Sequence, residues 1–186
     1  QVLHYQRETF VRWWARRSAG RKLGTGKKAA LFAGCLVNYQ ATDVGKATVQ
    51  VLEKNGVEVA LPDQSCCGMP SFDIGDTAAM VAAAERTIAS LKSWVDQGYD
   101  VVIPTPSCSL MVKREYVSLV AGDEAKRVAE HTYDISEYLM KMKREGGLAM
   151  DFTQKPGRVA YQVPCHLRDQ NIGFKSKELM ECAGAK

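Results

Sequence analysis

Short apolar strands alternate with longer amphipathic helices from Ala29 onward, and this alternation limits the possible folds more than any other feature. The spacing of apolar residues predicts strands at 29–33, 57–61, 99–103 and 158–163, and helices at 42–55, 75–97, 107–120, 123–130, 134–145 and 170–183. Asp73 or Asp76 is a suitable cap for the start of the long helix 75–97, and Gly98 for its end. Strands that alternate with helices are typical of a parallel sheet with right-handed crossovers. We therefore predict an α/β fold, a doubly wound parallel sheet with flanking helices.

The N-terminal segment differs from the rest of the chain in charge. Residues 1–28 carry eight Lys or Arg and one acidic residue, a net charge of +7, whereas the other 158 residues carry a net charge of −3. Residues 2–18 are predicted to form an amphipathic helix, and a Gly- and Lys-rich linker follows up to residue 28. Because the main body is mildly acidic, it lacks the basic face that nucleic-acid binding requires.

The overall composition is that of a globular protein with a substantial core. Hydrophobic residues make up 46% of the chain and charged residues 25%. No apolar run approaches the roughly 20 residues of a transmembrane helix, and the first twenty residues do not resemble a secretory signal. We expect a cytoplasmic protein that reaches the inner membrane only through partners. In that compartment its six cysteines are better suited to metal or redox chemistry than to disulfides.

Five of the six cysteines follow predicted strands closely. These candidate site residues are Cys35, Cys66, Cys67, Cys108 and Cys165. The carboxyl ends of parallel strands share one edge of the sheet, and open α/β folds bind their ligands at that edge. We therefore expect these cysteines to converge. Cys182 lies inside the last predicted helix, where a small buried side chain is the simpler interpretation.

The chemistry of thiolates leaves three possibilities open. A site made only of thiolates favours an iron–sulfur cluster or zinc. The adjacent pair Cys66 and Cys67 is also compatible with a redox disulfide. His166 follows Cys165 directly, and we expect it to have a hydrogen-bonded structural role.

The chain contains a weak internal repeat. In each copy a strand, a cysteine, a helix and a glycine follow one another, around Cys35 in the first copy and Cys165 in the second. The second copy stops soon after Gly184. We therefore expect three parts, namely the helix and linker at 1–28, a first cysteine-rich domain at 29–155, and the start of a truncated second domain at 156–186. The chain is expected to be an internal fragment of a longer protein.

Four motifs together resemble a known family. They are Phe32-Ala-Gly-Cys35, Cys66-Cys67-Gly68-Met-Pro, Pro106-Ser-Cys108 and Val163-Pro-Cys165-His166-Leu-Arg. These motifs resemble the Rossmann-like, cysteine-rich CCG domains found in heterodisulfide reductases, in the iron–sulfur proteins of glycolate and lactate oxidases, and in anaerobic glycerol-3-phosphate dehydrogenases. The stretch from Gly34 to Tyr39 with Gly45-Lys46 is most similar to the glycerol-3-phosphate type.

The resemblance implies a set of ligands and a function. It implies that Cys35, Cys66, Cys67 and Cys108 bind a [4Fe–4S] cluster, and that Cys165 is the first cysteine of a second domain. It implies electron transfer between a flavoprotein dehydrogenase subunit and a membrane (quinone-side) or thiol-side partner. Heterodisulfide reductase-like catalysis and a zinc-bound structural domain are the alternatives. The sequence departs from the full family pattern at Thr105, which stands where a further cysteine is usual, and in the absence of a second Cys-Cys-Gly motif.

Overall fold

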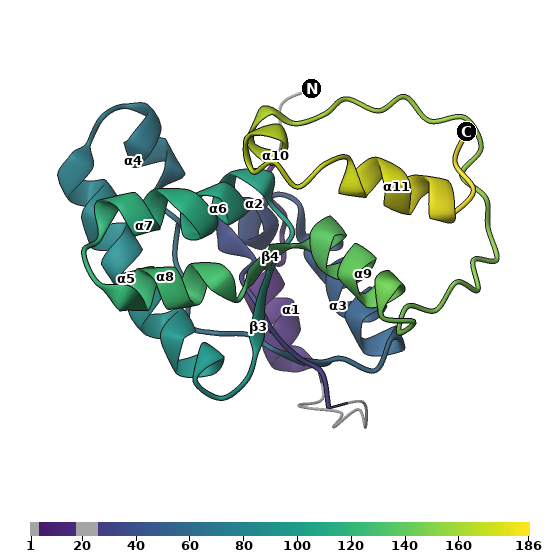
Figure 1. Cartoon of the computed structure of the whole chain (residues 1–186), viewed down its shortest axis with the longest axis horizontal. Helices are drawn as coiled ribbons and strands as arrows, with labels where there is room; N and C mark the ends of the chain where they lie inside the picture. The colour runs from purple at the N-terminus through teal and green to yellow at the C-terminus, as the bar shows by residue number, and fades with distance from the viewer. Residues whose placement is uncertain (1–3, 18–25) are drawn as a thin grey trace.

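The part of the chain that the structure describes forms a four-stranded parallel sheet with helices on both faces (Figure 1). The computed structural model describes residues 4–17 and 26–186. The strands are β1 (Lys28–Leu31), β2 (Glu58–Ala60), β3 (Asp100–Ile103) and β4 (Thr132–Asp134). Their order is β2-β1-β3-β4, and each neighbouring pair is parallel, with Ala30 opposite both Ala60 and Val101. This architecture confirms the predicted α/β class.

The helices account for most of the remaining described residues. In chain order they are α1 (Phe10–Arg16), α2 (Gly34–Tyr39), α3 (Thr42–Lys54), α4 (Met69–Asp73), α5 (Thr77–Val95), α6 (Pro106–Leu110), the π-helical turn η1 (Met111–Glu115), α7 (Tyr116–Leu119), α8 (Asp123–Glu130), α9 (Ile135–Arg144), α10 (Cys165–Asp169) and α11 (Lys175–Cys182). The start of α5 was predicted correctly, because the Asp76 side chain caps it by accepting a hydrogen bond from the Ala79 backbone N–H at 3.0 Å.

The core lies on both faces of the sheet because successive strand residues point to opposite sides. Val101 and Ile103 of β3 pack with buried residues of α5, η1, α7 and α8. Val102, between them, packs on the other face with Leu52 of α3 and residues of α9. The sheet is therefore covered on one side by α5 to α8 and on the other by α3 and α9 (Figure 1).

The predicted N-terminal helix is shorter than expected. It covers only Phe10–Arg16, and the Thr9 side chain caps it. Phe10 is fully buried against α3, where Gly45 leaves room for it, since a Cβ atom on that glycine would lie 2.7 Å from the Phe10 ring. Residues 1–3 and most of the predicted linker (18–25) lie outside the described residues.

The predicted strand at 158–163 was wrong. These residues belong to the described part of the chain but form no strand there, and most of them are exposed. The fourth strand is instead Thr132–Asp134, directly before α9. A strand needs a neighbouring backbone with free hydrogen-bonding groups, and β4 already occupies the edge beside β3.

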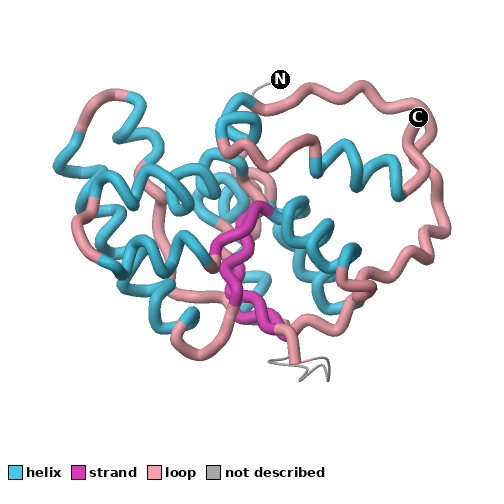
Figure 2. Tube along the Cα trace, viewed as in Figure 1, coloured by secondary structure: helices cyan, strands magenta, loops and turns pink. Residues whose placement is uncertain are grey.

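The predicted helix at 170–183 is shorter than expected, since only Lys175–Cys182 (α11) is helical there, and the short helix α10 before it was not predicted. The chain turns between α10 and α11 at Asn171 and Gly173, whose φ angles are +53° and +77°. A long loop, 145–164, leads from α9 to α10, and Figure 2 shows it running around the outside of the molecule. Leu179 of α11 attaches this C-terminal segment to the core beside α9.

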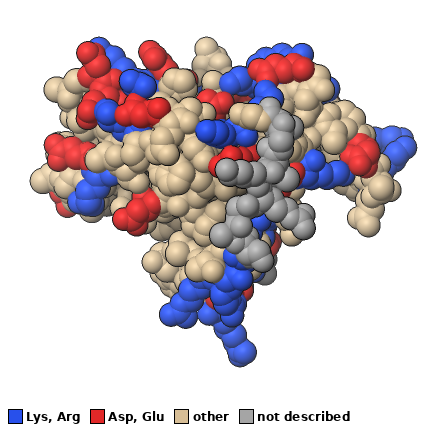
Figure 3. All heavy atoms as spheres, turned by 90° about the horizontal axis from the view of Figure 1, so that it is seen from below, with Lys and Arg blue, Asp and Glu red and all other residues tan. Residues whose placement is uncertain are grey.

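The surface carries both signs of charge. Seen from below, acidic and basic side chains are mixed over much of the molecule, and Lys and Arg gather on one projecting edge (Figure 3). In the described residues no helix is long and apolar enough to cross a membrane.

Candidate functional site

The strand order creates a crevice between the carboxyl ends of β1 and β3. From β1 the chain goes to β2 on one side, and it then returns to β3 on the other side. Such a reversal is the usual position of a ligand site in an open α/β sheet. Cys35 follows β1 at the second position of α2, and Cys108 follows β3 within α6. Both sides of this crevice therefore carry a cysteine.

Four cysteines that follow three different strands lie together at this point, and we call them the cysteine row: Cys35, Cys66, Cys67 and Cys108. The sulfurs of Cys35 and Cys66 are 3.9 Å apart. Cys66 is hydrogen-bonded to Cys67, and Cys67 to Cys108. The structure thus brings together four of the five predicted site residues.

The row has a buried end and an open end. Cys67 and Cys108 are only 2% and 4% exposed, whereas Cys35 and Cys66 are half-buried. The open end borders a hollow of about 310 Å³ lined by Val11, Gly34, Cys35, Asn38, Tyr39, Gln64, Ser65 and Cys66. Solvent or a partner therefore has access to the row from the Cys35 and Cys66 side.

The surroundings favour the protonated form of three thiols of the row, those of Cys35, Cys66 and Cys67. Burial, followed by the neighbouring Cys66, raises the pKa of Cys35. The hydrogen bond with Cys67, followed by burial, raises the pKa of Cys66. The hydrogen bond with Cys108 raises the pKa of Cys67 to about 12. A metal that bound here would have to displace these protons.

Two glycines let the cysteine loops approach closely. Gly34 has a φ angle of +65°, and a Cβ atom on it would lie 3.0 Å from the Cys108 sulfur. Gly68, at φ +86°, begins α4, and a Cβ atom there would lie 3.1 Å from the Ala83 Cβ of α5. A side chain at either position would strain the backbone and push the loop away from its neighbour.

The buried end of the row rests on the π-helical turn. This turn links α6, which carries Cys108, to α7, which begins with Tyr116. Tyr116 is fully buried, and its hydroxyl donates a 2.7 Å hydrogen bond to the Cys67 carbonyl oxygen. Burial raises the pKa of this hydroxyl, which therefore stays a donor. Tyr116 is a supporting residue that the sequence analysis missed.

Gln64 was missed as well. Its side chain lies between the end of β1 and the loop that carries Cys66, and it contacts both through backbone hydrogen bonds. Its position two residues before Cys66 was the only signal in the sequence.

Cys165 does not join the row. Because the predicted strand before it is missing, Cys165 instead starts the short helix α10 and is exposed. Among the described residues, no sulfur–sulfur contact connects it with the row. Its neighbour His166 contacts α6, since the His166 Nδ1 atom is 2.8 Å from the Ser107 hydroxyl. The expected structural role of His166 agrees with this hydrogen bond.

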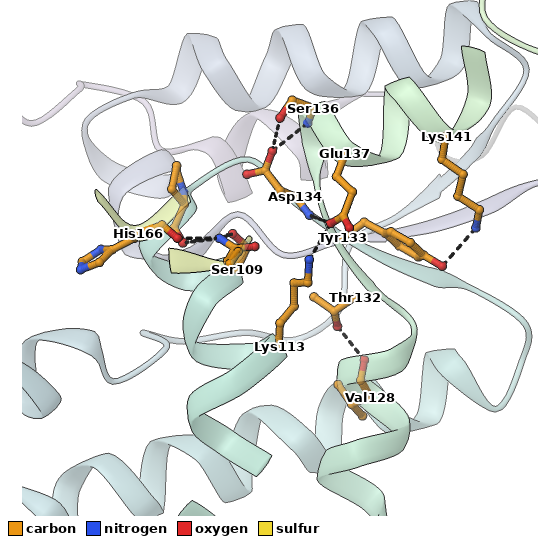
Figure 4. Close-up of polar contacts among 12 residues, drawn as sticks. Ser109, Lys113, Val128, Thr132, Tyr133, Asp134, Ser136, Glu137, Lys141 and His166 are labelled. Atoms are coloured by element: carbon orange, nitrogen blue, oxygen red, sulfur yellow. Dashed lines mark hydrogen bonds and ion pairs between the residues drawn. The ribbon is translucent and has the colours of Figure 1, made fainter. Parts of the chain in front are cut away.

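A polar cluster lies next to the row, toward β4 (Figure 4). Asp134 caps α9, accepting hydrogen bonds from the Ser136 N–H at 2.9 Å and from the Ser136 hydroxyl. Gln170, which follows α10, donates to the Ser109 hydroxyl at 2.8 Å and also contacts the carbonyls of Pro106 and His166. Asp134 and Gln170 thus each connect neighbouring segments of the chain at this edge.

The donor set of the row is compatible with an iron–sulfur cluster. In the part of the chain that the structure describes, no three His, Cys, Asp or Glu side chains are grouped as ligands of one ion. A structural zinc ion needs four ligands around one point. A cluster distributes its thiolate ligands over several irons, and four cysteine thiols without a carboxylate are a usual set for it.

Comparison with known proteins gives a family match and several relatives. The family described as "Cysteine-rich domain" (CCG) matches residues 29–113. A lactate utilization protein A of Geobacillus thermodenitrificans (strain NG80-2) is 36% identical over 146 residues, which cover 75% of this chain and 58% of that protein. The protein of the same name from Geobacillus kaustophilus (strain HTA426) is 35% identical over 158 residues, 82% of this chain and 62% of that protein. The one from Bacillus subtilis (strain 168) is 38% identical over 121 residues, 62% of this chain and 49% of that protein.

The chain thus spans about three fifths of the length of the first two relatives. No solved structure matches it significantly.

Proposed function

We propose that the cysteine row holds an iron–sulfur cluster and transfers electrons in the oxidation of lactate, because residues 29–113 match the cysteine-rich domain (CCG) family and the relatives are lactate utilization proteins. The observation that carries the proposal is the gathering of four thiols, from segments that follow three strands, at the crevice between β1 and β3. When bound, the cluster supplies one-electron redox chemistry. We take [4Fe–4S] as the cluster type.

The chain's own residues hold the ligands and control access to them. Cys67 and Cys108 lie in the apolar core beside Phe32, Met111 and Tyr116, which exclude water from that end. Cys35 and Cys66 face the hollow, where another redox group can come close. The buried end thus provides a low dielectric, and the open end provides the route for electrons.

The relatives decide which substrate we propose. They are lactate utilization proteins, so we propose lactate as the electron source and not glycerol 3-phosphate or glycolate. The partners we propose are a flavoprotein dehydrogenase subunit that delivers electrons and a quinone-side acceptor that receives them. A deletion strain of the host should grow poorly on lactate and normally on glycerol 3-phosphate. The opposite pattern would contradict the choice of lactate.

One observation favours a second function. The 3.9 Å separation of the Cys35 and Cys66 sulfurs would also suit thiol–disulfide catalysis. Turnover of a disulfide substrate by metal-free protein would support this alternative, and turnover that requires iron would support the heterodisulfide reductase type.

The cluster itself is tested by anaerobic reconstitution of the chain. We expect a broad absorption band near roughly 400 nm that bleaches with dithionite, and equal amounts of iron and sulfide. Cys66→Ala and Cys108→Ala should lose the band. Cys182→Ala is the matched control, because Cys182 contacts Lys143 at the far end of α11 and should leave the band unchanged. A wild-type protein that takes up no iron would overturn the proposal.

A further inference from the structure

The Gln64 side chain joins two of the cysteine loops through four hydrogen bonds. Its Oε1 atom accepts from the backbone N–H groups of Ala33 at 2.6 Å and Gly34 at 3.0 Å. Its Nε2 atom donates to the carbonyl oxygens of Leu31 at 3.1 Å and Pro62 at 3.2 Å. A primary amide has two acceptor positions and two donor hydrogens, so this side chain is fully used.

The hydrogen bonds of Gln64 satisfy backbone groups at the start of α2. The helix α2 begins after Ala33, whose methyl side chain cannot accept the free N–H groups at the helix start. Gln64 supplies that acceptor from another loop, directly beside Cys35. The same residue lies two positions before Cys66 in the sequence. One amide therefore connects the backbone before Cys35 with the backbone before Cys66.

We propose that Gln64 is a positioning residue that sets the separation of the Cys35 and Cys66 sulfurs. Both cysteines form the open, half-buried end of the row, where the core holds the loops less firmly than at Cys67 and Cys108. The consequence for a bound cluster rests on the proposed function. The joint between the two loops does not.

Amide geometry explains why other side chains fail at this position. Glutamate would still accept from Ala33 and Gly34, but its second oxygen would face the carbonyls of Leu31 and Pro62 and repel them. Methionine has a similar length and makes none of the four hydrogen bonds. Gln64→Met should therefore have the larger effect and Gln64→Glu the smaller one.

The first experiment needs no cluster. Phenylarsine oxide condenses with two nearby thiols, forming two As–S bonds and releasing one water, and peptide mapping identifies the bridged pair. In reduced, metal-free protein we expect a Cys35–Cys66 bridge, formed about tenfold more slowly in Gln64→Met, as expected for the loss of one to two net hydrogen bonds. Gln50 is exposed on α3, so Gln50→Met is the matched control and should react at the wild-type rate.

The second experiment measures the reconstituted protein. We expect iron release to a chelator to be about tenfold faster in Gln64→Met than in wild type, with a changed electron paramagnetic resonance signal of the reduced cluster. Thermal unfolding shows whether Gln64→Met is folded. If it is not, the same two measurements on Gln64→Glu and Gln64→Asn test the positioning role of Gln64.

The outcomes separate the two proposals. If wild-type protein binds no iron, the proposed function fails, while the arsenical reaction still tests Gln64. A folded Gln64→Met variant that bridges Cys35 to Cys66 and releases iron at wild-type rates would overturn the role of Gln64 alone. A wild-type protein that bridges Cys66 to Cys67 instead would also overturn it.

Discussion

The carboxyl edge of the sheet has two halves that use different chemistry. The inner half, at β1 and β3, holds the cysteine row. The outer half, at β3 and β4, holds the polar cluster of Ser107, Ser109, Asp134, Ser136, His166 and Gln170. Thiols are weak hydrogen-bonding groups and stay available to a metal. Most polar groups of the outer half instead form hydrogen bonds within the protein.

In each half, one glutamine side chain connects neighbouring segments by hydrogen bonds. We call these connections the inner joint and the outer joint, and they differ in how many hydrogen-bonding positions of the amide are used. Gln64 uses all four of its hydrogen-bonding positions. Gln170 donates from Nε2, but among the described residues its buried Oε1 atom has no hydrogen-bond partner. A buried acceptor without a partner costs about 1–3 kcal/mol. The inner joint should therefore be the stronger one.

The largest expected difference concerns the apolar support of the two halves. Phe32 is 1% exposed and packs with Cys67 and Cys108 in the main core. Phe32→Ala should lower the free energy of unfolding by about 3–5 kcal/mol, measured by equilibrium urea unfolding. Leu167 of α10 is 3% exposed, but it follows the long loop 145–164. Leu167→Ala should mainly reduce hydrogen-exchange protection in residues 165–182. Equal losses of global stability in the two variants would contradict the comparison.

A smaller difference in the free energy of unfolding is expected between the removal of one hydroxyl from the inner half and the removal of one from the C-terminal segment. Tyr116→Phe leaves the buried Cys67 carbonyl without its donor and should cost about 1–2 kcal/mol. Tyr161, in the C-terminal segment, is half-buried, and its hydroxyl contacts the Ser176 hydroxyl at 2.6 Å. Tyr161→Phe should cost about 0.5 kcal/mol or less, because water can replace the lost partner. Urea unfolding of both variants checks this, and a cost at Tyr161 as large as that at Tyr116 would show that the C-terminal segment is held as firmly as the core.

Elements with a regular apolar pattern could be predicted from the sequence, and elements that depend on tertiary contacts could not. Helices with a clear apolar period were predicted closely, and the predicted helix 123–130 coincides with α8. Strand β4 was missed because three residues, Thr132–Asp134, are too few for a period, and the longer apolar stretch 158–163 was taken in its place. Strand identity there depends on which segment reaches the free edge of β3, and this is a tertiary property.

The candidate site was also predictable only where the local sequence pattern decides the position of a residue. The positions of Cys35, Cys66, Cys67 and Cys108 after strands were enough to predict that they meet, although their role as ligands stays a prediction. Cys165 was placed by a strand that does not exist. Gln64 and Tyr116 were missed because their partners are backbone groups distant in sequence, at Leu31, Ala33 and Cys67.

Replacing Gln170 tests the weaker joint directly. Gln170→Met removes a donor from the carbonyls of Pro106 and His166, but it also removes the buried Oε1 atom that has no partner among the described residues. The two effects oppose each other, so the change in the free energy of unfolding should stay within about 0.5 kcal/mol. Gln64→Met should lower the free energy of unfolding by more, about 2 kcal/mol, because Gln64 has no unpaired atom whose removal would offset the lost hydrogen bonds. A larger loss at Gln170 than at Gln64, measured by urea unfolding, would reverse the ranking of the two joints.

The smallest expected effect is a pH dependence confined to the outer half. Burial raises the pKa of Asp134 above its ordinary value of 3.8, against the opposing hydrogen bonds from Ser136, while Glu137 and Lys113 nearby act in opposite directions. The protonated form is thus favoured in the folded state. The contribution of protonated Asp134 to the free energy of unfolding is complete below pH 3.8. It is lost as the pH rises through the raised pKa of Asp134. Asp134→Asn keeps a capping oxygen for the Ser136 N–H and cannot ionise.

The measurement that isolates this effect is the difference in unfolding free energy between wild type and Asp134→Asn across roughly pH 3 to 7. Relative to the variant, wild type should be most stable at the acid end and should lose this advantage as the pH rises. A wild type that instead gains stability over Asp134→Asn with rising pH would mean that the hydrogen bonds from Ser136 outweigh burial. The carboxylate would then be a favourable part of the outer half and not a cost to it.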